Sequence, residues 1–303
     1  MLNLFLRRAT VAGASALAIG FASPAALACS TCKCGDYTIT LFGTEKAYGG
    51  RLRVGLDYLY RSETAGAAGP TRQDTEEQRA TLGLAYSFSP DLTVALQLPF
   101  VRKEVTTANL AREEAEGMGD VDLTARWTLY RSGAVSGRHL AGVRGGLRLP
   151  TSEEVRGPNG QKVSIDAQPD AGATVPSIGG WYGYYRFPWF ASLSTTYFHY
   201  GEEGNQDFRG GDVWLVSALG QYGLTQTLAL QFGVDMRQSE KNRFSGVEDP
   251  DSGGFLAMGF VGAALRIGED LLLHAGGQAT LVENLNGEQD EDPALRLGMT
   301  YDF

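Results

Sequence analysis

From residue 50 to the C-terminus, about twelve stretches of roughly ten residues follow one another, each alternating apolar and polar side chains. The predicted strands are 50–61, 78–88, 91–104, 119–130, 138–149, 173–187, 189–200, 212–223, 226–238, 254–266, 270–282 and 293–303. Beyond the N-terminus no run of about 18 apolar residues could form a membrane-spanning helix. A soluble β-sandwich would also show the alternation within strands.

The lengths of the connections distinguish these two folds. Short connections lie at 89–90, 131–137, 187–188, 224–225 and 268–269, and long ones at 62–77, 105–118, 150–172, 201–211, 239–253 and 283–292. Short turns at one end and long loops at the other are typical of an outer-membrane barrel. We therefore predict an all-β fold, an antiparallel transmembrane β-barrel of about 12 strands with both termini periplasmic. The longest loop, 150–172, could fold inward and narrow the mouth.

The last strand shows the expected two faces. Leu295, Leu297 and Met299 share one face with Tyr301 and Phe303, whereas Arg296, Thr300 and Asp302 share the other. The stretches from Leu92 to Phe100 and from Leu228 to Met236 repeat the pattern. An apolar face suits lipid and a polar face suits the barrel interior. The terminal Tyr301 and Phe303 resemble the C-terminal signature that the barrel assembly machinery reads.

The first 28 residues have the features of a secretory signal peptide. Arg7 and Arg8 precede an apolar stretch, and Ala26-Leu27-Ala28 offers small residues for cleavage. We expect three parts: a signal peptide at 1–28, a periplasmic cysteine-containing segment at 29–49, and the outer-membrane barrel at 50–303. The predicted location is the outer membrane of a Gram-negative bacterium, after secretion across the inner membrane.

Three cysteines, Cys29, Cys32 and Cys34, form a C-x-x-C-x-C cluster at the expected mature N-terminus. A disulfide that leaves one thiol over is one interpretation in an oxidising periplasm. Acylation of Cys29 is another, and binding of a soft metal such as Zn²⁺ or Cu⁺ is a third. No histidine follows the pair, so attachment of a c-type haem is not indicated.

Ionisable residues fall on the polar faces of the predicted strands. An ionised side chain that faces lipid costs about 2–4 kcal/mol at the bilayer midplane, so these residues are expected to line the lumen. The candidate pore-lining residues are Arg53, Arg79, Asp120, Asp122, Arg126, Arg144, Arg148, Asp235, Arg237 and Arg296, together with Asp57 and His274. They would set ion selectivity in an open pore or form internal ion pairs in a closed one. The loop 283–292 is acidic, and we expect it on the outer surface.

The sequence offers no catalytic constellation. The three histidines, His139, His199 and His274, lie in no Ser/His arrangement, and the His-x-Ser-Asn stretch of the outer-membrane phospholipase is absent. No glycine-rich phosphate loop and no basic nucleic-acid patch is present. We therefore expect neither an enzyme nor a nucleic-acid-binding protein, and no cofactor apart from a metal at the cysteines.

Two motifs carry a family resemblance. The stretch from Gly117 to Trp127 contains Gly-Met-Gly-Asp, and Gly146 to Thr151 ends in Leu-Pro-Thr, where Ser152 replaces the usual glycine. These stretches, with Leu98-Pro99-Phe100 before them, resemble the outer-membrane family named for the meta pathway of phenol degradation. The resemblance implies a channel or transporter for small hydrophobic or aromatic compounds.

Two functions follow as hypotheses. The first is an outer-membrane channel for small solutes, surrounded by outer-membrane lipid. The second is a non-conducting barrel that anchors or scaffolds a metal-handling or redox partner through its N-terminal cysteines.

Overall fold

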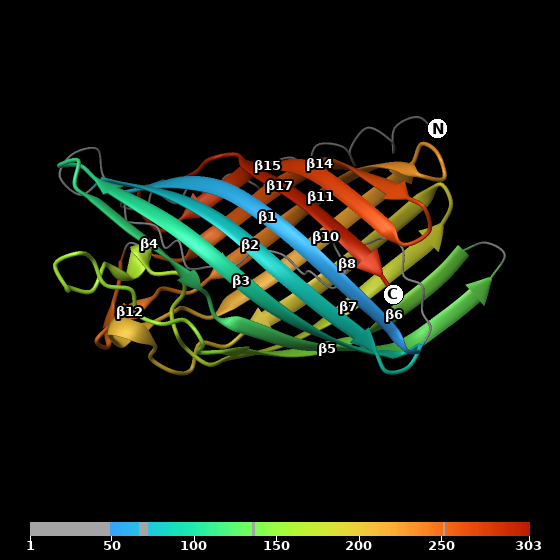
Figure 1. Cartoon of the computed structure of the whole chain (residues 1–303), viewed down its shortest axis with the longest axis horizontal. Helices are drawn as coiled ribbons and strands as arrows, with labels where there is room; N and C mark the ends of the chain where they lie inside the picture. The colour runs from blue at the N-terminus through green and yellow to red at the C-terminus, as the bar shows by residue number, and fades with distance from the viewer. Residues whose placement is uncertain (1–48, 67–71, 135–136, 251) are drawn as a thin grey trace, which may run out of the picture.

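The computed structural model describes residues 49–66, 72–134, 137–250 and 252–303. Within these residues, twelve long antiparallel strands close into a barrel (Figure 1). They are β1 (Arg51–Ala65), β2 (Gln73–Ser87), β3 (Leu92–Thr107), β5 (Val121–Ala134), β6 (Gly137–Leu149), β7 (Val175–Arg186), β8 (Trp189–Phe198), β10 (Val213–Gly223), β11 (Leu228–Ser239), β14 (Gly254–Ile267), β15 (Leu271–Leu285) and β17 (Ala294–Asp302). The ring closes because β1 pairs with β2 on one side and with β17 on the other.

The fold class predicted from the sequence is confirmed, and each predicted stretch corresponds to one strand of the ring. The strands follow the ring in chain order. The short turns lie at the same end as the start of β1 and the C-terminus, where the Phe303 amide donates a hydrogen bond to the Leu52 carbonyl at 2.8 Å. That this end is periplasmic stays a prediction.

The two faces of β17 separate as the sequence predicts. Leu295, Leu297 and Met299 are 46%, 42% and 47% exposed on the outer surface, whereas Arg296 and Thr300 are buried in the barrel. The alternation arises because successive side chains of a strand point to opposite sides of the sheet. The same parity holds along β3 and β11.

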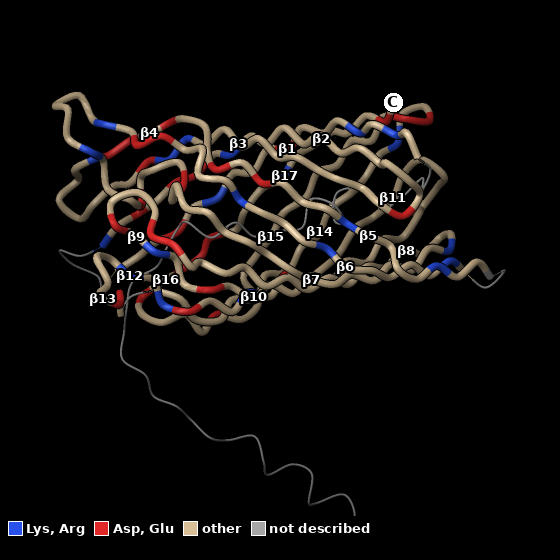
Figure 2. Tube along the Cα trace, turned by 90° about the horizontal axis from the view of Figure 1, so that it is seen from below, with Lys and Arg blue, Asp and Glu red and all other residues tan. Residues whose placement is uncertain are grey.

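An apolar band surrounds the barrel near its short-turn end. On β3 the outward residues from Leu92 to Phe100 are apolar, and the next two outward residues are Arg102 and Glu104. A tilted strand crosses a bilayer in about 9–11 residues, so this band has the length that a membrane requires. Figure 2 shows charged residues gathered toward the long-loop end of the molecule. The closed barrel and its apolar band form the architecture of an outer-membrane protein.

The sheet extends past the apolar band at the long-loop end. The strand β4 (Arg112–Met118) pairs with the end of β3, and β16 (Gln289–Glu291) pairs with the end of β1. Three short strands, β9 (Phe208–Arg209), β12 (Arg243–Phe244) and β13 (Val247–Glu248), form a separate small sheet. The sequence pattern predicts loops for these segments and for the ends of β1 and β2. At those ends outward residues such as Ser62 and Glu76 are polar, although the backbone pairing continues.

The segment 150–172 folds inward, which is the arrangement that its length suggested. Val163 and Ala167 are buried against Val105 of β3 and Ala115 of β4. Gln168 is fully buried and fastens the segment to itself, donating to the Val155 and Val163 carbonyls at 3.0 and 3.1 Å. The segment includes the short 3-10 helix η1 (Ile165–Ala167), and η2 (Asn205–Asp207) lies in the next long loop. In the part of the chain that the structure describes, no helix has the length and apolar character needed to span a membrane.

Candidate functional site

The interior of the barrel begins, at the short-turn end, with a cluster of two arginines around one carboxylate. Arg53 of β1 donates from Nε and Nη2 to the two carboxylate oxygens of Asp302 on β17, at 2.6 and 2.9 Å. Arg51 also pairs with Asp302. Because β1 and β17 are the strands that close the ring, these ion pairs lie across the closure. A bidentate arginine–carboxylate pair fixes geometry as well as charge.

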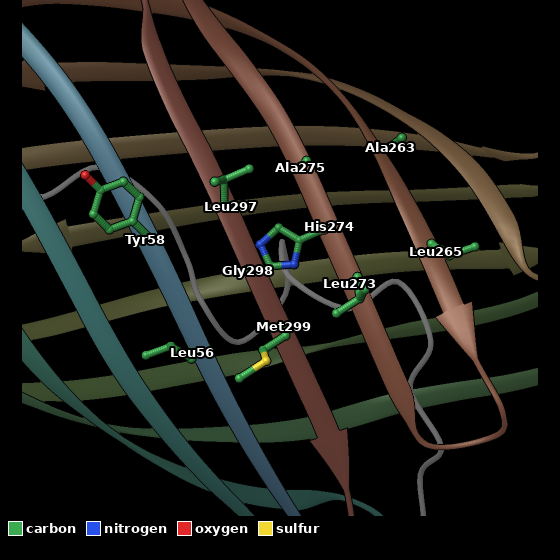
Figure 3. A pocket seen from close by; sticks show the side chains of 10 residues that line it. All are labelled: Leu56, Tyr58, Ala263, Leu265, Leu273, His274, Ala275, Leu297, Gly298 and Met299. Atoms are coloured by element: carbon green, nitrogen blue, oxygen red, sulfur yellow. The ribbon is translucent and has the colours of Figure 1, made fainter.

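A second cluster joins β1, β15 and β17 farther along the lumen. The Nε2 atom of His274 lies 3.1 Å from Asp57 Oδ2, and Arg296 Nε lies 3.7 Å from Asp57 Oδ1. Gly298 stands between them on β17, and a Cβ atom there would approach His274 Nε2 to 2.5 Å. The His274 side chain lies beside Gly298 behind the apolar outer wall of Leu297 and Met299 (Figure 3).

A larger ion-pair network spans the barrel on the long-loop side of this cluster. Arg61 of β1 donates from Nη2 to Glu77 of β2 at 2.8 Å, and its Nη1 atom lies 3.7 Å from both Glu63 and Glu291. Arg237 of β11 approaches the same Glu291 at 3.7 Å. In the ring β14, β15 and β17 separate β11 from β1, so the chain of contacts reaches across the interior. We call these five residues the transverse network.

The outer-loop assignment of Glu291 is therefore corrected. Its side chain is only 6% exposed, between Arg61 and Arg237. The reason is the short strand β16, which pairs with β1 so that Glu291 stands opposite Glu63, whose side chain points inward. The outer position of this loop was inferred from its acidic composition alone, and composition carries no information about strand pairing.

Arginine and aromatic side chains line the opposite wall, formed by β5, β6 and β7. The guanidinium of Arg126 lies 4.6 Å from the ring centre of Trp181, and that of Arg138 lies 4.9 Å from the ring of Tyr185. Arg144 of β6 stands directly opposite Arg126 of β5 in the strand register. Small residues occupy other inward positions of β6 and β7, among them Gly142, Gly146, Ser177, Gly179 and Gly183. Figure 1 places β5, β6 and β7 side by side in one part of the wall.

Arg148, Asp122 and Arg79 join this wall to the inward loop. Arg148 Nε donates to Asp122 Oδ1 at 3.0 Å, and its Nη1 donates to the Tyr200 hydroxyl at 3.0 Å. Arg79 of β2 donates to Glu77 at 2.6 Å and lies 3.7 Å from Asp170 of the inward segment. The contact between Arg79 and Asp170 therefore joins the inward segment to charged side chains that project from the strands into the lumen.

Asp120 differs from the expectation that it lines the lumen. It lies just before β5 and is fully buried, and its carboxylate accepts hydrogen bonds from the backbone amides of Thr151, Ser152 and Gly172 at 3.1, 3.0 and 2.9 Å. Strand parity does not apply outside the strand. The carboxylate instead organises both ends of the inward segment.

The other predicted lumen residues point inward. Asp235 of β11 accepts a hydrogen bond from Gln278 of β15 at 3.0 Å, and Arg144 and Arg296 are buried. Their role in selectivity stays a prediction. Tyr301 and Phe303 lie on the outer surface, with ring centres 4.7 Å apart. Cys29, Cys32 and Cys34, like the rest of 1–48, lie outside the described residues, and no group of potential metal ligands occurs within them.

Sequence reasoning missed three prominent interior residues. Glu77 was assigned to a loop, although it shares the parity of Arg79. Lys103 shares the parity of Gln97 on β3 and is fully buried, so the pattern already contained its inward direction. Trp181 was hidden because β7 carries aromatic residues on both faces, with Trp181 buried and Tyr182 exposed.

No family model matches the sequence, and no curated protein matches it. Among solved structures, the chain is similar to an outer-membrane channel from Pseudomonas putida F1, with a TM-score of 0.69 and 18% identity over 86% of this chain and 99% of that one. It is also similar to the translocator domain of the autotransporter NalP from Neisseria meningitidis, with a TM-score of 0.48 and 14% identity over 85% of this chain and 90% of that one. The comparison with the Pseudomonas putida toluene transporter TodX gives a TM-score of 0.41 and 10% identity over 84% of this chain and 89% of that one. The first similarity shows the fold, a closed barrel of the outer-membrane channel type.

Proposed function

We propose that the chain is an outer-membrane channel that passes small solutes, aromatic compounds among them. The observation that supports this proposal most directly is the transverse network, in which arginines and glutamates of β1, β2, β11 and β16 meet inside a membrane-sized barrel. Rings of charged side chains at a constriction select among permeating solutes. A twelve-stranded barrel is wider than the small barrels whose interiors side chains fill and narrower than the large porins.

Aromatic solutes are favoured by the wall opposite this network. Trp181 and Tyr185 project inward from β7, and Phe190 of β8 packs against Tyr185 with ring centres 4.9 Å apart. Small inward residues flank them, which leaves ring faces and edges next to the lumen. Neutral aromatic surfaces bind aromatic solutes through offset or edge-to-face contacts.

The test is the conductance of the refolded mature protein in a planar bilayer, with the reversal potential measured under a salt gradient. We expect discrete conductance steps. Arg237→Gln shortens a side chain of the transverse network and removes its charge, so the steps should grow and the selectivity should shift toward cations. Arg102→Gln is the matched control, since Arg102 pairs with Glu114 on the outer surface and both side chains are about half exposed.

A folded barrel that gives no steps at any voltage would contradict the channel. It would favour the second candidate, a closed barrel that anchors a partner, which the transverse network also supports because its ion pairs span the interior. In that case metal binding by the cysteine-containing segment, and its loss when Cys32 and Cys34 become serine, is the next measurement.

A further inference from the structure

Two glutamates of the transverse network stand side by side because of the strand register. Glu63 of β1 is directly opposite Glu291 of β16, and both side chains are buried inside the barrel. Directly opposed residues have Cβ atoms about 4.5–5.5 Å apart, and like charges at such positions destabilise the pairing. The two side chains are 5% and 6% exposed, so water and salt screen their repulsion poorly. This pair is therefore a place in the network where two negative charges are hard to hold.

The cations of the network compensate the two glutamates unequally. Arg61 donates from Nε and Nη2 to Glu77 Oε2 at 3.2 and 2.8 Å. Its Nη1 atom lies 3.7 Å from Glu63 Oε2 and 3.7 Å from Glu291 Oε1, which is too far for a hydrogen bond. Arg237 places a second guanidinium 3.7 Å from Glu291. Glu63 is therefore the less compensated carboxylate of the pair, and a proton stabilises it more.

One oxygen of the Glu63 carboxylate lacks a donor. Among the residues that the structure describes, Glu63 Oε2 is buried and accepts no hydrogen bond. Lys103 of β3 stands opposite Glu77 in the strand register and acts on Glu63 through its charge, but its buried amine makes no hydrogen bond within the described part of the chain. Hydrogen bonds to an ionised carboxylate favour the ionised form. A buried oxygen that receives none favours the protonated form.

Glu63 lies beyond the apolar band, since the outward residues beside it on β1 and β2, Ser62 and Glu76, are polar. Burial raises the pKa of Glu63 from its ordinary 4.5 to about 7. The charged groups that face it from β1, β2, β3 and β16 are Arg61, Glu77, Lys103 and Glu291. The two carboxylates among them add to the rise of the pKa, and the two cations oppose it. The electrostatic surroundings therefore agree with the geometry of the pair.

A proton on Glu63 changes the charge of the transverse network by one unit. When all five residues are ionised, two arginines face three glutamates, and one bound proton makes the opposite charges equal in number. The sign of this change does not depend on the other charges of the lumen, because loss of a proton always makes this level more negative. A more negative constriction attracts cations and repels anions.

We propose that Glu63 and Glu291 form a proton-binding pair, and that uptake of the proton by Glu63 switches the selectivity of the lumen. With the proton bound, the transverse network attracts cations less. With the proton released, the network favours cations. The proposal concerns the regulation of the channel, and it rests on the proposed function for its physiological meaning.

Reversal potentials of the refolded mature protein, measured under a salt gradient from about pH 5 to about pH 9, test the switch. The ratio of cation to anion permeability should rise with pH by about fivefold, the factor expected when a unit charge about 4 Å away acts through water. The midpoint of this transition should lie near the Glu63 value of about 7. A ratio that does not change with pH would overturn the proposal.

Three variants, each checked for the folded barrel, assign the transition to one residue. Glu63→Gln imitates the protonated form, so it should hold the permeability ratio at its low-pH value throughout. Glu63→Asp keeps a carboxyl that can ionise and should retain a transition. Glu76→Gln is the matched control, because Glu76 is exposed on the outward face of the neighbouring strand, and it should behave as the natural protein does. A full transition in Glu63→Gln would refute the assignment.

Infrared spectroscopy gives a second measurement that does not require conduction. The difference spectrum between low and high pH should contain the C=O band of a protonated carboxyl, and this band should disappear in Glu63→Gln and persist in Glu76→Gln. A protein that conducts but lacks both this band and the transition keeps the proposed function and loses the switch. A protein that shows the band and never conducts keeps the proton-binding pair, and it contradicts both the channel and the switching of its selectivity.

Discussion

At the scale of single residues, Asp120 illustrates how one carboxylate organises a long segment. Its two oxygens accept from the amides of Thr151, Ser152 and Gly172, so they hold together the beginning and the end of the 150–172 segment. Hydrogen bonds to charged groups contribute about 1.5–3 kcal/mol each, more than neutral ones. A residue that the strand pattern would place in the lumen wall thus determines how the loop above it folds.

Asp120→Asn should loosen the segment without unfolding the barrel. The asparagine side chain keeps one acceptor oxygen but turns its NH2 group, a donor, toward the Gly172 N–H. We therefore expect the free energy of local opening of the segment to fall by about 2 kcal/mol. Hydrogen exchange at the Ser152 and Gly172 amides measures this. Glu154→Gln is the control, because it breaks the exposed Lys162–Glu154 ion pair of the same segment and should leave exchange almost unchanged. Equal protection in both variants would contradict the role of Asp120.

Asp166 gives the same segment a dependence on pH. Burial raises the pKa of Asp166 above its usual 3.8; Lys103 opposes the shift, while Asp249 and Glu113 add to it. A carboxyl whose pKa is raised in the folded segment favours the protonated form there. Its contribution to packing is therefore complete below the unfolded value and is lost as the pH rises through the folded value.

The corresponding measurement is exchange of the Ala167 amide, which donates to the Ser164 carbonyl at 3.1 Å. After correction for intrinsic rates, protection in the natural protein should fall as the pH rises above the ordinary aspartate value of 3.8. Asp166→Asn, which cannot ionise, should keep its protection constant over this range. A natural protein whose protection does not change with pH would exclude Asp166 as the responsible group.

At the scale of elements, each strand of the apolar band has one lipid face and one lumen face. On β3, Leu96 is central among the outward apolar residues, and Gln97 points inward, opposite Asp122 of β5. Leu96→Arg should destabilise the barrel by about 2–4 kcal/mol, the cost of a cation at the bilayer midplane. Gln97→Arg should cost little because the new cation meets Asp122. Unfolding by denaturant from lipid vesicles measures both, and a similar loss for the two would contradict the assignment of faces.

The strands were predictable because a period of two needs only the pattern of side chains. The prediction for β6 began one residue late and ended correctly, at 138–149 against Gly137–Leu149. By contrast β4 was missed, since its outward residues are charged and its pairing with β3 depends on hydrogen bonds that the pattern does not encode. Parity also placed Arg126 and Arg144 correctly inside, but it could not show that they stand opposite one another. That relation depends on strand register, which a bulge between Thr128 and Tyr130 shifts.

At the scale of the whole molecule, closure of the ring depends on the contact between the first and last strands. The register pairs Arg53 with Asp302 and Tyr60 with Leu295, and the same two strands carry the ion pairs of Asp302. Closure therefore joins residues about 250 positions apart, and such non-local pairings form late and slowly in folding. Until it closes, the last strand presents an unpaired edge, which is a hazard for aggregation. A factor that binds this strand before closure would protect it.

The C-terminal aromatic residue is suited to that recognition and contributes little to stability. The Phe303 ring is on the outer surface, with the residue 66% exposed, and it packs edge-on against the Tyr301 ring with ring centres 4.7 Å apart. Phe303→Ala should change the free energy of unfolding in vesicles by about 0.5 kcal/mol or less, as exposed substitutions usually do. In cells it should lower the amount of assembled barrel severalfold, because the assembly machinery no longer finds its signature.

Phe88 provides the matched control at the same end of the barrel. It is 63% exposed and packs edge-on against Tyr86 at 4.8 Å, so it copies the environment of Phe303 on an internal turn. Phe88→Ala removes the same apolar surface from the same membrane boundary and leaves the chain end intact. Normal assembly of this variant beside poor assembly of Phe303→Ala would locate the signal at the terminus. Equal assembly of the two variants would instead make both rings ordinary anchors in the membrane interface.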